Sequence, residues 1–164
     1  MVITVKLYLQ RDTSDIYARY QVCDESGRLK YNIRGKRTPS GESLKIYDLN
    51  SEVLCKIRGI GFSVLSVYSI SCGGESIRLN LAFANGRAAV QFRGISFYVR
   101  GDVLFGSYSI LDADTAVVCS VGKDFAKGCT QLEVSQQERE MFCLAAAACI
   151  DSLAVGRAPA LQMT

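Results

Sequence analysis

The feature that most constrains this chain is a run of ten uninterrupted apolar residues, Met141–Ile150, near its C-terminal end. A helix that is apolar on every side must be buried, either in protein or in lipid. A membrane span needs about 20 apolar residues, and here Asp151 interrupts the run. No cluster of Lys or Arg flanks it to mark a cytoplasmic side. We therefore expect a helix at the centre of a protein core, in preference to a membrane anchor.

The residues around this run predict a core helix over about 136–155. Ser135 and Glu138 have the spacing of a capping box, in which each side chain bonds the other's free backbone N–H. Gly156 stands where a C-terminal left-handed residue is expected, and Pro159 follows it. We expect Asp151 to lie near the far end of the core and to reach backbone donors or water. The side chains expected to be largely buried are Met141, Phe142, Leu144, Ala145, Ala148, Ile150, Leu153 and Ala154.

The chain before residue 134 consists of short runs in which apolar residues alternate with polar ones. Examples are ITVKLYL at 3–9, SLKIYDL at 43–49 and SYSILDA at 107–113. Gly, Asn, Asp or Ser separate the runs about every 8–12 residues, which is typical of an all-β sandwich or barrel. No linker or composition break divides the chain, so we expect a single domain over 1–164 with its strands at about 2–134.

A short internal repeat indicates how these strands are connected. The segment 46–57 aligns without a gap on 110–121, and 22–33 fits the same frame, which places three aspartates in equivalent positions: Asp24, Asp48 and Asp112. Each segment predicts a β-hairpin whose Asp carboxylate bonds the backbone of its own turn. Three carboxylates could suggest a metal site, but we expect turn formation because they recur in successive hairpins.

The composition argues against catalysis by the common nucleophile systems. The chain has no histidine, which removes Ser-His and Cys-His pairs, and it has no GxSxG or phosphate-binding glycine motif. Its seven cysteines lack CxxC spacing, so we expect reduced, mostly buried thiols and no metal site. We expect no enzyme activity and no cofactor. The N-terminal residues lack the pattern of a signal peptide, which favours a cytoplasmic protein.

The basic residues are the most informative feature for function. The net charge is only +3, but residues 1–60 hold 11 Lys and Arg against 7 Asp and Glu. Alternation in strands places residues two apart on one face. Such a face could be an ordinary solvated barrel exterior, or it could contact anionic lipid headgroups or a nucleic-acid backbone. The candidate anion-binding residues are Arg28, Lys30, Arg34, Lys36, Lys56 and Arg58.

Four segments together resemble the YxjI/LURP-one-related family. They are YQVCDESGRLKYNIRG at 20–35, LKIYDLNSEVLCKIRG at 44–59, the hairpin region 97–121, and EMFCLAAAACIDSLAV at 140–155. The proteins of this family have the tubby C-terminal-like fold, which is also the fold of phospholipid scramblases. The resemblance implies a mainly β protein, an antiparallel barrel of about twelve strands that encloses one central hydrophobic C-terminal α-helix.

The resemblance also carries functional expectations. Tubby proteins are associated with phosphoinositide binding, so we expect a non-enzymatic binding or scaffold module, cytoplasmic or peripheral at the membrane. Its partner would be an anionic phospholipid surface or a protein, with nucleic acid disfavoured. The alternative is a small-ligand-binding or catalytic protein with a pocket at a barrel end. A purely structural or oligomerising subunit is a third interpretation, and the sequence carries no information on oligomeric state.

Overall fold

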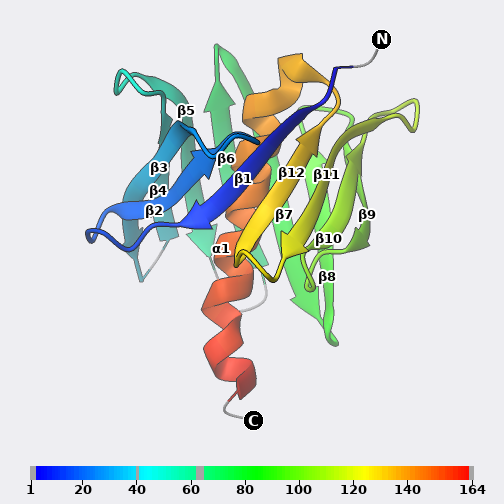
Figure 1. Cartoon of the computed structure of the whole chain (residues 1–164). Coiled ribbons are helices and arrows are strands. Elements are labelled where there is room, and N and C mark those ends of the chain that lie inside the picture. Colours follow the sequence, from blue (N-terminus) through cyan, green and yellow to red (C-terminus); the bar gives the residue numbers. More distant parts are fainter. Residues whose placement is uncertain (1–2, 40, 62–64, 163–164) are drawn as a thin grey trace.

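Twelve strands curl around one C-terminal helix in the computed structural model, which describes residues 3–39, 41–61 and 65–162 (Figure 1). All neighbouring strands pair antiparallel, in the order β8-β7-β6-β5-β4-β3-β2-β1-β12-β11-β10-β9. The edge strands β8 and β9 are not hydrogen-bonded neighbours in that order, so the barrel is nearly closed. The predicted fold class is confirmed. The strands are β1 (Val5–Arg11), β2 (Ala18–Cys23), β3 (Leu29–Thr38), β4 (Gly41–Tyr47), β5 (Val53–Gly61), β6 (Leu65–Cys72), β7 (Glu75–Ala84), β8 (Arg87–Arg93), β9 (Tyr98–Asp102), β10 (Ser107–Leu111), β11 (Val117–Asp124) and β12 (Cys129–Val134).

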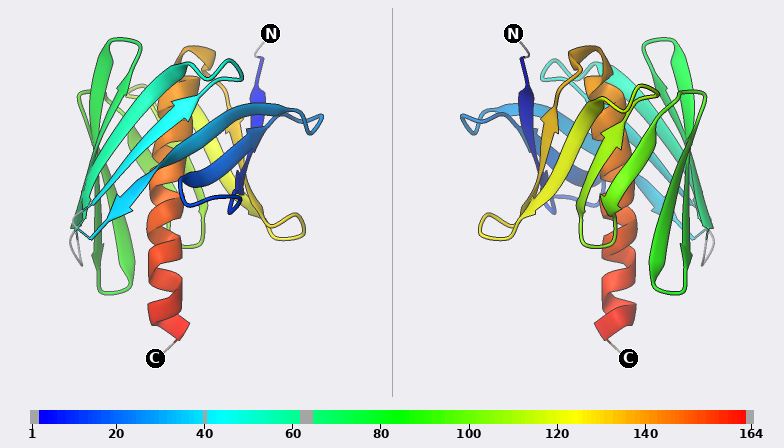
Figure 2. Two further views of the ribbon diagram at one scale, coloured as in Figure 1. Left: turned by 90° about the vertical axis from the view of Figure 1, so that its left-hand side faces the viewer. Right: turned by 90° about the vertical axis from the view of Figure 1, so that its right-hand side faces the viewer.

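The apolar run forms the centre of the fold. A 3-10 turn, η1 (Gln137–Arg139), leads into the helix α1 (Glu140–Gln162). The first part of α1 runs inside the barrel and its C-terminal part projects from one end, as both views of Figure 2 show. Residues 143–149 are each at most 1% exposed. Burial is confirmed for Phe142, Leu144, Ala145, Ala148 and Ile150, whereas Met141 is only partly buried. Leu153 and Ala154, which were also expected to be buried, have side chains outside the described residues.

The small side chains of α1 match large ones on the strands. The largest fully buried side chains of the sheet are Leu and Ile, including Leu7, Ile33, Leu44, Ile57 and Leu79. Because a protein interior is packed to nearly constant density, a barrel lined with Leu and Ile leaves room for a helix of Ala and Cys at its axis.

The predicted cap at Ser135 and the predicted C-terminal end of the helix are wrong. The backbone N–H of Ser135 donates to the Val118 oxygen at 2.9 Å, so Ser135 stays with the sheet, and η1 has no side-chain cap. At the other end α1 continues through Gly156 and Pro159 to Gln162. A glycine inside a helix costs only about 1 kcal/mol relative to alanine, so Gly156 is a weak stop signal.

Asp151 fastens α1 where the helix leaves the barrel. The residue is 7% exposed, and its carboxylate accepts hydrogen bonds from Lys123 Nζ at 2.6 Å, the Tyr20 hydroxyl at 2.8 Å and the Thr130 hydroxyl at 3.2 Å. Arg11 lies 3.7 Å away. The expected partners, backbone donors or water, are therefore replaced by side chains of four strands, as a buried carboxylate requires.

The three predicted aspartate turns are confirmed. In each, Oδ1 accepts the backbone N–H groups of the second and fourth following residues, at 2.9 and 3.1 Å for Asp24, 2.9 and 2.9 Å for Asp48, and 2.9 and 3.0 Å for Asp112. The residue with positive φ is Gly27 (84°), Ser51 (62°) or Thr115 (63°). A hydrogen bond from the Ser26 hydroxyl lowers the pKa of Asp24, and one from the Gln136 amide lowers the pKa of Asp112.

Two further observations complete the fold. The expectation of reduced thiols is wrong for Cys55 and Cys72, which form a disulfide between β5 and β6, while the other five cysteines are free. Across the described ranges, no helix combines the length and the hydropathy that a membrane crossing requires.

Candidate functional site

Two rows of outward-facing residues cross strands β3 to β8, and we call the surface that they form the basic face. Within each row the neighbours are direct cross-strand partners. The residues between them along the strands, such as Leu44, Ile57 and Ile77, are buried, so alternation turns both rows toward solvent. These eleven positions hold seven Lys or Arg, four Ser and no carboxylate. The upper row is Arg34, Lys45, Lys56, Ser71 and Ser76, and the lower row is Lys36, Ser43, Arg58, Ser69, Arg78 and Arg93.

Positive charges stand directly opposite one another on this face. Arg34, Lys45 and Lys56 follow in succession across three strands, and Arg78 is paired with Arg93. Like charges in such positions destabilise a sheet, by an amount comparable to the roughly 0.2–1 kcal/mol that favourable pairs contribute. The arrangement is therefore not explained by the stability of the sheet.

The protein's own carboxylates neutralise little of the positive charge on the basic face. Among the described residues, Asp15 is the one carboxylate within ion-pair distance of these seven cations, and it lies 3.0 Å from Arg34 Nη2. Hydrogen bonds from the Tyr17 backbone N–H and from Arg34 lower the pKa of Asp15, so this pair stays charged at neutral pH. Lys36 rests over the Tyr17 ring, with Nζ 5.7 Å from the ring centroid.

Apolar side chains border the basic face at the barrel end where α1 emerges. Ile60, two residues beyond Arg58 on β5, is 54% exposed, and Leu65 at the start of β6 is 40% exposed. Ile60 is paired with Val67 across the two strands, so the apolar border continues the same outer surface. The site is a cationic sheet face with an apolar rim.

Four of the six predicted residues lie together on this face: Arg34, Lys36, Lys56 and Arg58. Arg28 does not belong to it, because it lies in the β2–β3 turn, where its N–H donates to Asp24.

Lys30 also lies apart, 3.6 Å from Glu140 at the start of α1. A β-bulge causes this. The pairing of β3 with β2 shifts so that Tyr31 faces Val22 and Leu29 faces Cys23. The expected two-residue alternation is interrupted at Lys30, and the grouping of Arg28 and Lys30 with the others was wrong.

Three cations of the face were not predicted. Lys45 could have been found from the sequence, because the 46–57 hairpin places it opposite Lys56. Arg78 and Arg93 join only through the register of β6, β7 and β8, and no local pattern specifies that register.

The two barrel ends differ in the room that they offer a ligand: one has a small cavity, and the other an open groove of about 420 Å³. Beside Asp151 and Lys123 lies a cavity of about 20 Å³, enough for about one water molecule. At the opposite end a groove runs past Val5, Lys30, Tyr31 and Glu140. There burial and the hydrogen bond that Tyr31 donates to Glu140 raise the pKa of Tyr31. Within the described ranges, no three Cys, Asp or Glu side chains gather as metal ligands.

Comparison with known proteins gives three consistent matches. The model of the LURP-one-related family matches residues 5–151. The uncharacterised protein YxjI of Bacillus subtilis (strain 168) is 20% identical over 152 residues, which cover 90% of this chain and 92% of YxjI. The X-ray structure of a protein from Arabidopsis thaliana superimposes with a TM-score of 0.63 at 14% identity, over 92% of this chain and 91% of that one. The last match shows a shared fold.

Proposed function

The chain belongs to the LURP-one-related family, and we propose that it is a non-enzymatic binding module that docks on anionic phospholipid headgroups through its basic face. The observation that carries the proposal is the pair of rows with seven cations and a single carboxylate partner among the described residues. An external anionic surface would relieve the repulsion between directly opposed cations, which the sheet itself leaves uncompensated.

The size of the face agrees with a weak, reversible membrane contact. Six strands about 4.8 Å apart span roughly 24 Å, and because the sheet is curved only part of that width can touch a flat membrane. Each Lys or Arg near an anionic leaflet contributes about 1 kcal/mol. Three such contacts give about 3 kcal/mol, which corresponds to roughly a 150-fold preference over a neutral membrane. Salt should weaken this preference.

The apolar rim favours a lipid surface over a nucleic acid. Ile60 and Leu65 lie on the outer surface beside the cations, where they can enter the boundary between headgroups and acyl chains. The eleven positions of the two rows hold no aromatic residue, so they lack the stacking platforms that single-stranded nucleic acids use.

Co-sedimentation with vesicles tests this function. Wild-type protein should bind phosphatidylcholine vesicles that contain phosphatidylserine and should bind pure phosphatidylcholine vesicles much less. The triple variant Lys45→Ser, Lys56→Ser and Arg58→Ser should lose at least tenfold in affinity while its thermal midpoint stays within a few degrees. A matched control, Lys6→Ser with Arg100→Ser, removes two cations from the other half of the barrel and should bind like the wild type.

Two outcomes contradict the proposal. One is binding that does not depend on lipid charge or on the triple substitution. The other is a duplex DNA that competes with the vesicles at equal phosphate concentration and binds with higher affinity, which would favour a nucleic-acid partner.

A further inference from the structure

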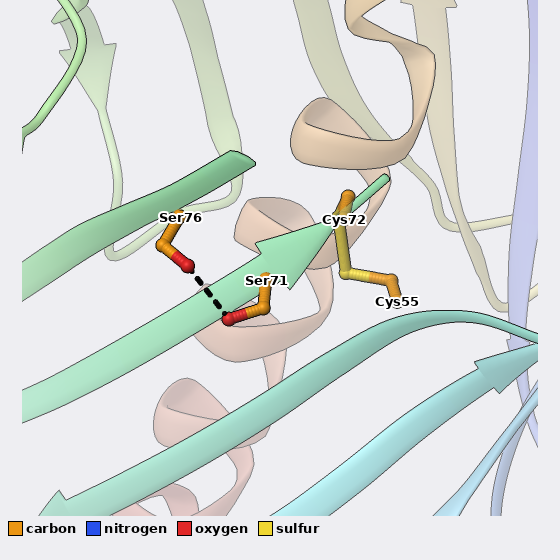
Figure 3. The surroundings of a disulfide bond; sticks show 4 residues. All are labelled: Cys55, Ser71, Cys72 and Ser76. Atoms are coloured by element: carbon orange, nitrogen blue, oxygen red, sulfur yellow. Dashed lines mark hydrogen bonds between the residues drawn. A yellow bond between two sulfur atoms is a disulfide. The ribbon is translucent and has the colours of Figure 1, made fainter. Parts of the chain in front are cut away.

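The Cys55–Cys72 disulfide lies at a position where the sheet itself brings two thiols together. The two residues are direct partners on β5 and β6, with Cα atoms 4.4 Å apart. This separation matches the close, non-hydrogen-bonded pairs of an antiparallel ladder, about 4.5 Å, in which side chains approach most closely. Figure 3 shows the bond joining the end of β6 to β5, beside the hydrogen bond between the Ser71 and Ser76 hydroxyls. The backbone pairing of β5 and β6 does not depend on the sulfur–sulfur bond.

The two cysteines differ slightly in exposure. Cys55 is 1% exposed, whereas Cys72 is 8% exposed and is the last residue of β6. The turn that follows consists of Gly73 and Gly74, both at positive φ, and no neighbouring atom lies within 4 Å of where a Cβ would stand on either. The turn beside Cys72 therefore carries no side chain that would cover this end of the bond.

We propose that Cys55 and Cys72 form a reversible thiol–disulfide site in the folded protein, which exchanges with low-molecular-weight thiols such as glutathione at Cys72. The thiolate of one glutathione attacks Cys72 Sγ, the Cys55–Cys72 bond breaks, and Cys55 leaves as a thiolate that takes a proton from water. A second glutathione thiolate attacks the glutathione sulfur of this mixed disulfide. Cys72 is released as a thiol, and the two glutathiones leave as their disulfide, so two electrons pass to the protein.

The second hairpin of the repeat shows that this pair is a specific feature of the first. Cys119 is the counterpart of Cys55, but its partner on the next strand, β12, is Val134. Cys119 instead faces the thiol of Cys143 on α1, and this contact together with burial raises the pKa of Cys143. Burial also raises the pKa of Cys149. Such thiols are poor nucleophiles, so neither cysteine of α1 should compete with glutathione for the Cys55–Cys72 bond.

Reduction should lower thermal stability without dismantling the barrel. The disulfide joins residues 17 apart in sequence, and closing a loop of about that length restricts the unfolded chain by an amount equivalent to roughly 6–12 °C in the midpoint of a domain of this size. The strands would remain paired through their backbone hydrogen bonds, so the reduced protein should stay folded.

Equilibration in glutathione buffers of graded ratio, followed by acid quenching, alkylation and peptide mass spectrometry, tests the site in the native protein. As the buffer becomes oxidising, the alkylated fractions of Cys55 and Cys72 should fall together. Both fractions should rise again when the buffer is made reducing. The thermal midpoint of the wild type should fall by about 6–12 °C on reduction. The double variant Cys55→Ser, Cys72→Ser should show no such fall, whereas Cys23→Ser, at a partly buried free cysteine, should keep it.

Single variants test the direction of attack. In Cys55→Ser, glutathione disulfide should modify Cys72 at least tenfold faster than it modifies Cys55 in Cys72→Ser. Equal rates would overturn the assignment of Cys72 as the entry point. If the wild-type bond between Cys55 and Cys72 can be reduced only in denaturant, the bond is purely structural. If both cysteines are alkylated under oxidising conditions, the bond does not form and the site is excluded. Either result overturns the proposal.

Discussion

The β4–β5 and β10–β11 hairpins are built alike on the inside and differently on the outside. Both turn at an aspartate with the same pair of backbone hydrogen bonds. Both also shift register at the same place, between Ile46 and Tyr47 in one and between Ile110 and Leu111 in the other. Their outward residues differ: Lys45, Lys56 and Arg58 in the first hairpin correspond to Ser109, Ser120 and Gly122 in the second.

The difference distinguishes the residues that the fold requires from the outward cations that it does not require. In the second hairpin the outward pair is a contact between the Ser109 and Ser120 hydroxyls at 3.2 Å, so the hairpin forms without cations. Around that half of the barrel the outer rows balance two cations, Lys6 and Arg100, with two carboxylates, Glu133 and Asp102. This contrast supports the proposal that the excess of positive charge on the other half serves an external partner.

The largest effect should come from the shared interior. Ile46 and Ile110 are equivalent and both 0% exposed, so Ile→Ala at either should destabilise the protein by about 2–5 kcal/mol through lost burial and a cavity. Urea unfolding followed by circular dichroism measures both. If one variant costs less than half as much as the other, the two hairpins are not equivalent in the core.

Overpacking the helix should have the next largest effect. Strands of both hairpins, β5 and β11, contact α1, and Ala146 and Ala147 are 0% and 1% exposed. Replacing either with leucine should lower the free energy of unfolding by about 1–3 kcal/mol, because the added atoms have no space. Unchanged unfolding curves for both variants would place the helix outside the barrel.

Substitution by glycine at two turn positions should stabilise the protein, in contrast to the core substitutions. Ser51 and Thr115 occupy positive φ, where Gly27 stands in the equivalent β2–β3 turn. A left-handed residue with a side chain costs about 1–2 kcal/mol, and the greater flexibility of glycine in the unfolded chain offsets roughly half of that. Ser51→Gly and Thr115→Gly should therefore stabilise by about 0.5–1 kcal/mol, and Gly27→Ser should destabilise by a similar amount. Thermal melts compare the three, and a loss of stability in both glycine variants would contradict the strain argument.

Exchanging the outward pairs should change stability least. Lys45→Ser with Lys56→Ser should raise the free energy of unfolding by about 0.5 kcal/mol, because it removes two opposed positive charges, and Ser109→Lys with Ser120→Lys should lower it similarly. Both effects should shrink as salt is added. If the first exchange instead costs more than 1 kcal/mol in urea unfolding, the lysines support the sheet and the argument for an external partner weakens.

Local sequence patterns predicted most of the fold because they report local physics. Alternation identified the strands, the recurring Asp24, Asp48 and Asp112 identified the turns, and the run from Met141 to Ile150 identified the buried helix. The ends of the helix were not predictable in this way, since Ser135 forms its bond with Val118 on β11, a contact that depends on how distant segments pack.

The candidate site was predictable only where its residues share a hairpin. The hairpin around Asp48 determines that Lys45 and Lys56 face each other, but Arg78 and Arg93 reach the same rows through three further strand pairings. Conversely, Lys30 was predicted to belong to the basic face, and a single β-bulge places it elsewhere. A shift of one residue moves a side chain to the other face, so no reading of separate strands could settle the membership of the face.

The sequence by itself thus determined antiparallel hairpins turned by aspartates and a buried apolar helix, because alternation, turn chemistry and hydropathy act over a few residues. The barrel that encloses this helix was expected from the family resemblance. The tertiary structure alone decided which cations gather into the basic face, which two of the seven cysteines meet across β5 and β6, and how Asp151 is held by four strands. The physical reason is the same in each case: these contacts join residues far apart in the chain, and their partners are set by strand register.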